Sequence, residues 1–292
     1  LAPNVKTVLE VDLLRYLTPP KSWIVPLVRP KRKVQNQAKY LNFNAEISKE
    51  PKKLAFEDVQ KDRVACYFHT GGTTGMPKVA QHKYSGIVYN GWVGSTIMLD
   101  ENDNLLCPLP LFHVMACHVI LMGAVANGAH VVFPTPQGYR GEGVFDNIWK
   151  LTERWKITFI VSVPTALAAM MQRPVNADVS SVKTAFSGSA PLALELFKRF
   201  EEATGVTIIE GYGMTEATFL VSGNPIDGKK KVGSVGIPFP YTKVKIMNVT
   251  IEGPSEAGVD DVGEICVSNP GVVAGHTYTE EDKNKDLYYG DY

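Results

Sequence analysis

Between Val64 and Glu210 the chain alternates short apolar runs with longer amphipathic segments, and this alternation limits the possible folds more than any other feature. The short runs have the length of buried strands, and the longer segments repeat apolar residues at helical spacing. The expected strands are Val64–Phe68, Asn104–Cys107, His130–Phe133, Thr158–Val163, Thr184–Phe186 and Thr207–Glu210. The expected helices are Tyr84–Met98, Val114–Ala126, Val144–Trp155, Pro164–Met171 and Leu192–Thr204. Alternating strands and helices predict an α/β fold with a mostly parallel sheet and helices on both faces.

The two ends of the chain differ from this central part. Residues 1–60 are rich in Pro and Lys and are typical of a connecting arm, with one short helix expected near Thr7–Tyr16. After Gly223, short apolar runs at Thr242–Met247 and Gly263–Ser268 are separated by Gly, Pro and Asn, which favours a small antiparallel β unit.

We therefore expect an incomplete connecting arm at 1–60, an α/β subdomain at 61–222 and a β-rich subdomain at 223–292. The chain begins without Met and stops abruptly after "DLYYGDY". We interpret it as a piece of a longer protein in which the β-rich subdomain is truncated.

Composition and charge exclude several classes of protein. The 292 residues, 45% of them hydrophobic, suffice for a sizeable core. Thirty basic and 30 acidic side chains give a formal charge of zero, which argues against binding nucleic acid. A segment without charged residues runs from Asp103 to Arg140, but Pro, His and Gly interrupt it, so we expect no membrane span.

Four cysteines are scattered along the chain, without a C-x-x-C pair or a His at a familiar metal-ligand spacing: Cys66, Cys107, Cys117 and Cys266. Such usage fits a reducing compartment, and we expect a cytoplasmic protein without disulfides and without a metal site built on these cysteines.

A run of small residues follows the first expected strand and leads into Pro77 and Lys78; it consists of Thr70, Gly71, Gly72, Thr73, Thr74 and Gly75. Backbone N–H groups of such a loop can converge on an anion, with hydroxyl groups and Lys78 adding donors and charge. The usual phosphate loop requires Gly-Lys-Ser/Thr, whereas Met76 and Pro77 intervene here, so an ordinary nucleoside triphosphatase is excluded. The alternative is a flexible surface turn.

A second segment, "EGYGMTEAT", follows the last expected strand. Tyr212 offers a flat ring for a purine, Thr215 a hydroxyl for an α-phosphate, and Glu216 a hard oxygen ligand for Mg²⁺. Alone, this segment could be an ordinary turn with a capping aromatic residue.

Together the two segments resemble the signatures of the adenylate-forming (AMP-binding) superfamily, which includes acyl-CoA synthetases, peptide-synthetase adenylation domains and luciferases. The resemblance covers Val64 to Tyr292, part of the family's large N-terminal domain. Val79 departs from the pattern, because a glycine is common there. "FSGSAPL" resembles the family segment that passes the adenine ring, with Ser189 where a second glycine is common, and "PLPLFHVMACH" resembles a stretch whose histidine, here His113, lies between nucleotide and acyl group.

The resemblance implies roles for individual residues. Thr215, Glu216, His113 and Lys78 would be catalytic, with Glu216 also the metal ligand. The nucleotide would be held by Thr70, Gly71, Gly72, Thr73, Thr74, Gly75, Lys78, Gly188, Ser189, Ala190, Gly211, Tyr212, Gly213, Met214 and Thr215. His82 matches a recurrent family histidine that we interpret as structural, and His118 is expected in a helix core or at the surface.

The implied function is that of an acyl-CoA synthetase, which uses ATP, Mg²⁺ and coenzyme A to convert a small-molecule carboxylate first to an acyl-adenylate and then to a thioester. Short-acyl members place Trp where this chain has Gly213, so a medium-chain, long-chain or aryl acid is favoured. The ribose-binding aspartate and the C-terminal catalytic lysine would lie beyond the chain; Asp291 is not assigned to the ribose. We expect activity in the full-length protein and none in the fragment.

Two alternatives stay open at this point: an amino-acid adenylation domain of a peptide synthetase, and a nucleotide- or acyl-binding module without catalysis. The sequence does not define the oligomeric state.

Overall fold

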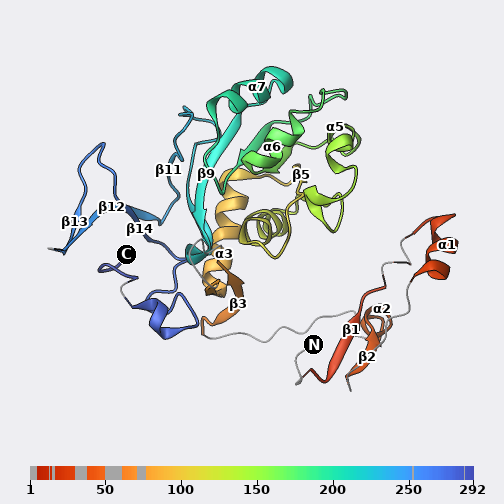
Figure 1. Ribbon diagram of the computed structural model, residues 1–292, viewed down its shortest axis with the longest axis horizontal. Helices are drawn as coiled ribbons and strands as arrows, with labels where there is room; N and C mark the ends of the chain where they lie inside the picture. Colours follow the sequence, from red (N-terminus) through yellow and green to blue (C-terminus); the bar gives the residue numbers. More distant parts are fainter. Residues whose placement is uncertain are drawn as a thin grey trace. The chain divides into compact units, whose positions relative to one another are not determined.

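The computed structural model describes residues 5–12, 14, 17–29, 38–49, 61–70, 77–251, 253–285 and 287–292 (Figure 1). The chain forms two compact units, Leu1–Gln60 and Lys61–Tyr292. The boundary that we placed at 222/223, within the second unit, stays a prediction.

The first unit contains two short strands, β1 (Thr7–Glu10) and β2 (Lys39–Asn42), which pair in parallel, and two helices, α1 (Lys21–Val28) and α2 (Phe43–Ile47). The prediction of a helix near Thr7–Tyr16 is therefore wrong for the residues that form β1. Thr7 and Val8 are β-branched, which favours an extended backbone. The pairing partner lies about 30 residues further along the chain, so local periodicity could not reveal it.

A seven-stranded sheet forms the centre of the second unit, in the order β11-β10-β9-β8-β7-β5-β6. The five strands β6, β5, β7, β8 and β9 are parallel to one another, whereas β10 and β11 are antiparallel additions at one edge. The strands are β5 (Asn104–Leu106), β6 (His130–Val132), β7 (Phe159–Ser162), β8 (Thr184–Ser187), β9 (Ile208–Met214), β10 (Phe219–Gly223) and β11 (Ile237–Pro238). The predicted α/β fold with a mostly parallel sheet is confirmed.

Helices lie on both faces of this sheet, as predicted (Figure 1). Successive side chains of β7 alternate between the two cores: Phe159 and Val161 pack with α3 and η3, whereas Ile160 packs with α5, α6 and α7. The helical segments are α3 (Tyr84–Val93) with its π-helical extension η2 (Gly94–Met98), η3 (Met115–Leu121) continuing into α4 (Met122–Asn127), η4 (Gly138–Arg140), α5 (Val144–Arg154), α6 (Pro164–Met170) and α7 (Leu194–Thr204).

The first expected strand of this unit, β3 (Val64–His69), lies outside the central sheet. It pairs antiparallel with β4 (Val79–Lys83), a strand that we did not predict. A connection of about nine residues can form a hairpin but is too short for a parallel crossover. Strands β3 and β4 therefore form a β-hairpin, and the glycine-rich segment lies between them in the sequence.

A separate three-stranded antiparallel sheet confirms the predicted small β unit. Its order is β13-β12-β14, with β12 at Lys243–Thr250, β13 at Gly253–Glu256 and β14 at Glu264–Ser268. A short helical turn, η6 (Glu281–Asn284), follows. Within the described residues, no helix is both long and apolar enough to cross a lipid bilayer.

Candidate active site

The base of the glycine-rich segment is closed by a backbone hydrogen bond. The amide of Thr70, which is 8% exposed, donates to the carbonyl of Lys78 at 2.9 Å. This bond continues the ladder of β3 and β4, so the hairpin strands hold the two ends of the loop together. The remaining predicted loop residues, Gly71, Gly72, Thr73, Thr74 and Gly75, lie outside the described residues.

Lys78 reaches the acidic turn through Tyr278. The Lys78 ammonium lies 4.6 Å from the centre of the Tyr278 ring, and the Tyr278 hydroxyl donates to Glu216 Oε1 at 2.6 Å. Burial and the neighbouring Glu216 carboxylate both raise the pKa of Tyr278, so the phenol remains a proton donor at neutral pH. Lys78 and Glu216, which we proposed from two separate motifs, therefore both contact the side chain of Tyr278.

Residues 277–279 run antiparallel beside β4 through one isolated bridge and two flanking backbone hydrogen bonds. Ala80 forms a bridge with Tyr278, Gln81 donates its amide to the Thr277 carbonyl at 2.8 Å, and Thr279 donates to Val79 at 3.0 Å. Sequence analysis missed Tyr278 because it lies in an irregular stretch far from both motifs and belongs to no recognisable pattern.

Glu216 belongs to η5 (Thr215–Ala217), the turn that follows β9. His82 on β4 donates its Nε2–H to the carbonyl of Thr215 at 2.7 Å, and Thr218, in the left-handed conformation at φ 60°, donates its hydroxyl to the carbonyl of Gly271. These contacts fix the backbone of the turn from both sides. Among the described residues, no donor contacts the second carboxylate oxygen of Glu216, which suits a hard cation that takes one protein carboxylate and several phosphate oxygens.

The predicted adenine segment lies next to the Tyr212 segment. Strands β8 and β9 are parallel neighbours with Ser187 opposite Glu210, so the residues that follow each strand meet at the carboxyl edge of the sheet. A Cβ added to Gly188 would lie 3.4 Å from the Gly211 carbonyl. Ser189 and Ala190 are exposed beside it, and Ser189 adopts φ 71°.

Tyr212 and Gly213 lie near the end of β9. Tyr212 is half-buried, and burial raises the pKa of its phenol. A Cβ added to Gly213 would lie 2.2 Å from the carbonyl oxygen of Phe219 on β10. The room that we expected beside Gly213 is therefore filled by the neighbouring strand, and this glycine gives no support for a large acyl group.

His113 lies beyond the carboxyl end of β5, on the same side as the acidic turn. Its Nδ1 accepts a hydrogen bond from the Met115 amide at 3.3 Å, and its ring packs edge-on against Phe219 with 6.4 Å between ring centres. His113 is an exposed side chain, and partial desolvation by these neighbours lowers its pKa, which favours the neutral imidazole.

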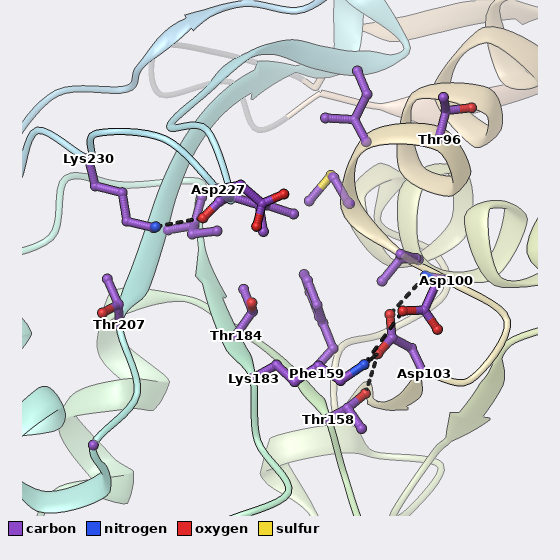
Figure 2. A pocket seen from close by; sticks show the side chains of 16 residues that line it. Thr96, Asp100, Asp103, Thr158, Phe159, Lys183, Thr184, Thr207, Asp227 and Lys230 are labelled. Carbon is purple, nitrogen blue, oxygen red and sulfur yellow. Dashed lines mark hydrogen bonds and ion pairs between the residues drawn. The ribbon is translucent and has the colours of Figure 1, made fainter.

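A cavity of about 480 Å³ lies at the opposite, amino-terminal edge of the sheet (Figure 2). Lys183 spans it with ion pairs to Asp103 at 3.2 Å and Asp100 at 3.5 Å, and Thr158 donates to Asp103 at 2.7 Å. None of the residues that we predicted for the site lines this cavity. The candidate site is therefore at the carboxyl edge, where a parallel sheet ordinarily binds its ligand.

A parallel sheet whose carboxyl edge carries an acidic turn and a small-residue turn has the arrangement in which α/β proteins ordinarily bind a ligand. A family model described as "AMP-binding enzyme" matches residues 18–277, and the chain belongs to this family. The match begins before Val64, so our restriction of the resemblance to Val64–Tyr292 was too narrow at its start.

The chain is 35% identical over 244 residues to a marinolic acid–CoA ligase of Pseudoalteromonas sp., a match that covers 80% of this chain and 37% of that protein. It is 29% identical over 290 residues to a long-chain-fatty-acid–CoA ligase of Bacillus subtilis, covering 95% and 50%. The solved structure of ATP-bound MatB from Rhodopseudomonas palustris superposes with a TM-score of 0.76 at 25% identity, covering 87% of this chain and 50% of that one. The chain thus spans half or less of the length of these proteins.

Proposed function

We propose that the full-length protein activates a carboxylic acid with ATP and transfers the acyl group to coenzyme A. A carboxylate oxygen attacks the α-phosphorus of ATP, and pyrophosphate leaves. The thiol sulfur of coenzyme A then attacks the acyl carbon, AMP leaves with the bond electrons, and the thiol proton passes to solvent. Membership of the AMP-binding enzyme family and the names of the CoA-ligase relatives support this proposal.

One observation carries the proposal most directly: Lys78, at the base of the loop, and Glu216, in the acidic turn, both contact Tyr278. A polyphosphate between them would have an ammonium group at one end and a carboxylate-bound Mg²⁺ at the other. When bound, Mg²⁺ would neutralise phosphate charge. Because this chemistry depends on position and charge, no protein nucleophile is needed.

The remaining proposed residues complete the nucleotide site. Thr70 and the loop that follows would contact the β- and γ-phosphates, and Thr215 the α-phosphate. Tyr212 would lie against the adenine, which passes along Gly188, Ser189 and Ala190. Gly211, Gly213 and Met214 would form the backbone of this wall, and His113 would lie between the nucleotide and the acyl group.

We further propose that the acid is a medium-chain, long-chain or aryl acid. An apolar hollow of about 520 Å³, lined by Leu109, Pro110, Leu111, Phe112 and the segment 133–136, adjoins His113 in sequence. Its lining suits a hydrocarbon chain or ring rather than a small polar acid.

The test is carboxylate-dependent exchange of labelled pyrophosphate into ATP by the full-length protein, with a panel of fatty acids, aryl acids, acetate and amino acids. Exchange with a fatty or aryl acid, followed by thioester formation with coenzyme A, supports the proposal. Exchange with an amino acid alone would assign an adenylation domain instead. Absence of exchange with every acid would leave only the non-catalytic binding function.

The 292-residue chain is expected to bind without turnover, because the proposed ribose aspartate and catalytic lysine lie outside it. Calorimetric titration with ATP and with a non-hydrolysable acyl-adenylate mimic would measure binding, and turnover by this chain alone would contradict the expectation.

A further inference from the structure

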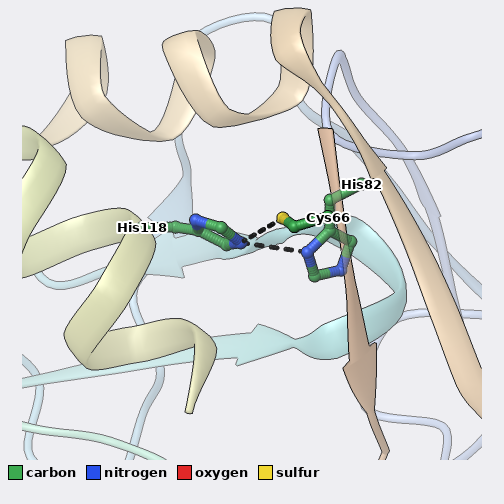
Figure 3. A group of neighbouring side chains, drawn as sticks. All are labelled: Cys66, His82 and His118. Carbon is green, nitrogen blue, oxygen red and sulfur yellow. Dashed lines mark hydrogen bonds between the residues drawn. The ribbon is translucent and has the colours of Figure 1, made fainter. Parts of the chain in front are cut away.

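Three side chains that could bind a metal ion meet at one point (Figure 3), and one of them, His82, contacts the acidic turn through the Thr215 carbonyl. Cys66 comes from β3, His82 from β4 and His118 from η3. His82 Nδ1 lies 3.0 Å from His118 Nε2, and Cys66 Sγ lies 3.8 Å from the same nitrogen. All three atoms lie within 4.8 Å of one another.

The hydrogen bonds of His82 orient its free lone pair into this cluster. Its Nε2 must carry the proton because its partner, the Thr215 carbonyl, only accepts. Nδ1 is then the unprotonated nitrogen, and it faces His118 Nε2. A backbone carbonyl that fixes the tautomer of a histidine in this way is the usual outer partner of a metal-bound imidazole.

His118 can present a lone pair to the same point. Its Nε2–H donates to His82 Nδ1, whereas its buried Nδ1 has no hydrogen-bond partner among the described residues. The proton of His118 can therefore move from Nε2 to Nδ1, because no existing hydrogen bond to Nδ1 has to break. The Nε2 atom of His118 is then unprotonated and free to bind a cation.

Both imidazoles are buried, and the donor atoms of the cluster determine which ion it suits. His82 is 0% and His118 2% exposed. Phe68 stacks on His82 at 5.2 Å and packs edge-on against His118 at 4.9 Å, which lines the cluster with an apolar ring. Two nitrogen donors and one sulfur donor suit Zn²⁺ better than Mg²⁺ or Ca²⁺, which prefer oxygen.

We propose that Cys66 Sγ, His82 Nδ1 and His118 Nε2 bind a Zn²⁺ ion. Ordinary zinc–ligand lengths in a tetrahedral site place neighbouring ligand atoms about 3.3–3.6 Å apart, between the two distances observed here. On binding, the Cys66 thiol loses its proton to solvent, the His118 proton shifts to Nδ1, and a solvent molecule takes the fourth position. The ion links the hairpin that carries the glycine-rich loop to the helix that follows His113.

The first test is titration of chelator-treated full-length protein with Co²⁺, whose thiolate complexes absorb in the near ultraviolet, followed by competition with Zn²⁺. One equivalent should bind to the unaltered protein with a sulfur-to-cobalt band. Cys66→Ala should lose the band and weaken Zn²⁺ binding by about 100-fold or more, because even outer partners of metal ligands contribute 10–100-fold. The control is Cys117→Ala, because Cys117 is also half-buried and lies on the same helix as His118. This variant should retain both the sulfur-to-cobalt band and the Zn²⁺ affinity. An equal band in Cys66→Ala, or none in the unaltered protein, would overturn the proposal.

A second measurement needs no variant. Zn²⁺ should slow the alkylation of Cys66, read by peptide mass spectrometry, and leave Cys117 and Cys266 unchanged. Equal alkylation of Cys66 with and without Zn²⁺ would contradict the site. Neither readout depends on ATP or an acid, so either can fail while the proposed ligase function stands.

Discussion

The hydroxyl of Tyr278 donates a 2.6 Å hydrogen bond to the carboxylate of Glu216. The bond joins the segment 277–279, which runs beside β4, to the turn after β9, so it holds the proposed metal ligand against the base of the glycine-rich loop. The ring of the same tyrosine lies under the Lys78 ammonium. Tyr278 is therefore a positioning residue in this account.

Tyr278→Phe separates these two contacts, because it keeps the ring and removes the hydroxyl. Loss of a hydrogen bond to a charged group costs about 1.5–3 kcal/mol, so we expect MgATP affinity to fall roughly 10-fold or more, measured by calorimetry on the full-length protein. Tyr289→Phe is the control, since the hydroxyl of this exposed side chain bonds the Pro254 carbonyl and its loss should change nothing. Unchanged MgATP affinity in Tyr278→Phe would show that the hydroxyl does not position Glu216.

Gly213→Ala tests the close approach of β9 and β10. The added Cβ would lie 2.2 Å from the Phe219 carbonyl oxygen, so the strands must separate, and we expect a loss of about 1–3 kcal/mol or more in the free energy of unfolding. Gly91→Ala in α3 is the matched control, because its Cβ would meet its nearest atom at an ordinary 3.4 Å and alanine favours a helix. Urea titration measures both, and equal stability of the two variants would contradict the predicted clash.

Asn90 ties α3 to β10. It is 0% exposed, accepts the Leu220 amide at 2.9 Å and donates to the Gly86 carbonyl at 2.9 Å. Asn90→Ala leaves a buried amide without a partner, so we expect a loss of about 1–3 kcal/mol in unfolding free energy. Asn147→Ala removes an exposed bond to Gly143 and should cost far less; similar losses in the two variants would refute the role of Asn90.

The pH dependence of stability should report on His113. Partial desolvation of this exposed side chain lowers the pKa of its imidazole below the usual value of 6.5, so the unfolded chain takes up a proton more readily than the folded chain. The contribution of His113 to stability is therefore complete above about pH 6.5 and declines as the pH falls toward the folded pKa. His113→Gln should lose less stability than the unaltered protein between pH 7 and pH 5.5. Identical losses, measured by urea unfolding, would exclude this contribution.

The parts of the fold that the sequence could predict are those with a local pattern. Strands β7, β8 and β9 are apolar because both of their faces are buried, and α5 and α7 carry clear helical periodicity. Strands β4, β10 and β13 escaped prediction because their pairing depends on neighbours rather than on their own sequence. The β1 strand was assigned to a helix for the same reason.

The candidate site shows the same difference between residues with a local sequence pattern and residues brought together from distant parts of the chain. The motif residues of the acidic turn and the adenine segment were recognisable because each group is contiguous. Tyr278 was not, since it reaches Glu216 from 62 residues away. Cys66 and His118 are 52 residues apart and come together only because β3 and η3 pack side by side, so our expectation of no metal site on the cysteines rested on spacing alone.

Carboxylate-dependent pyrophosphate exchange by Glu216→Gln tests the central claim most directly, namely that this carboxylate holds Mg²⁺ against the polyphosphate. The matched control is Glu264→Gln, an exposed carboxylate that lines the same small hollow as Glu216. We predict that Glu216→Gln lowers exchange by about 100-fold or more in the full-length protein, while Glu264→Gln exchanges at the unaltered rate. Exchange by Glu216→Gln at the unaltered rate would contradict the account.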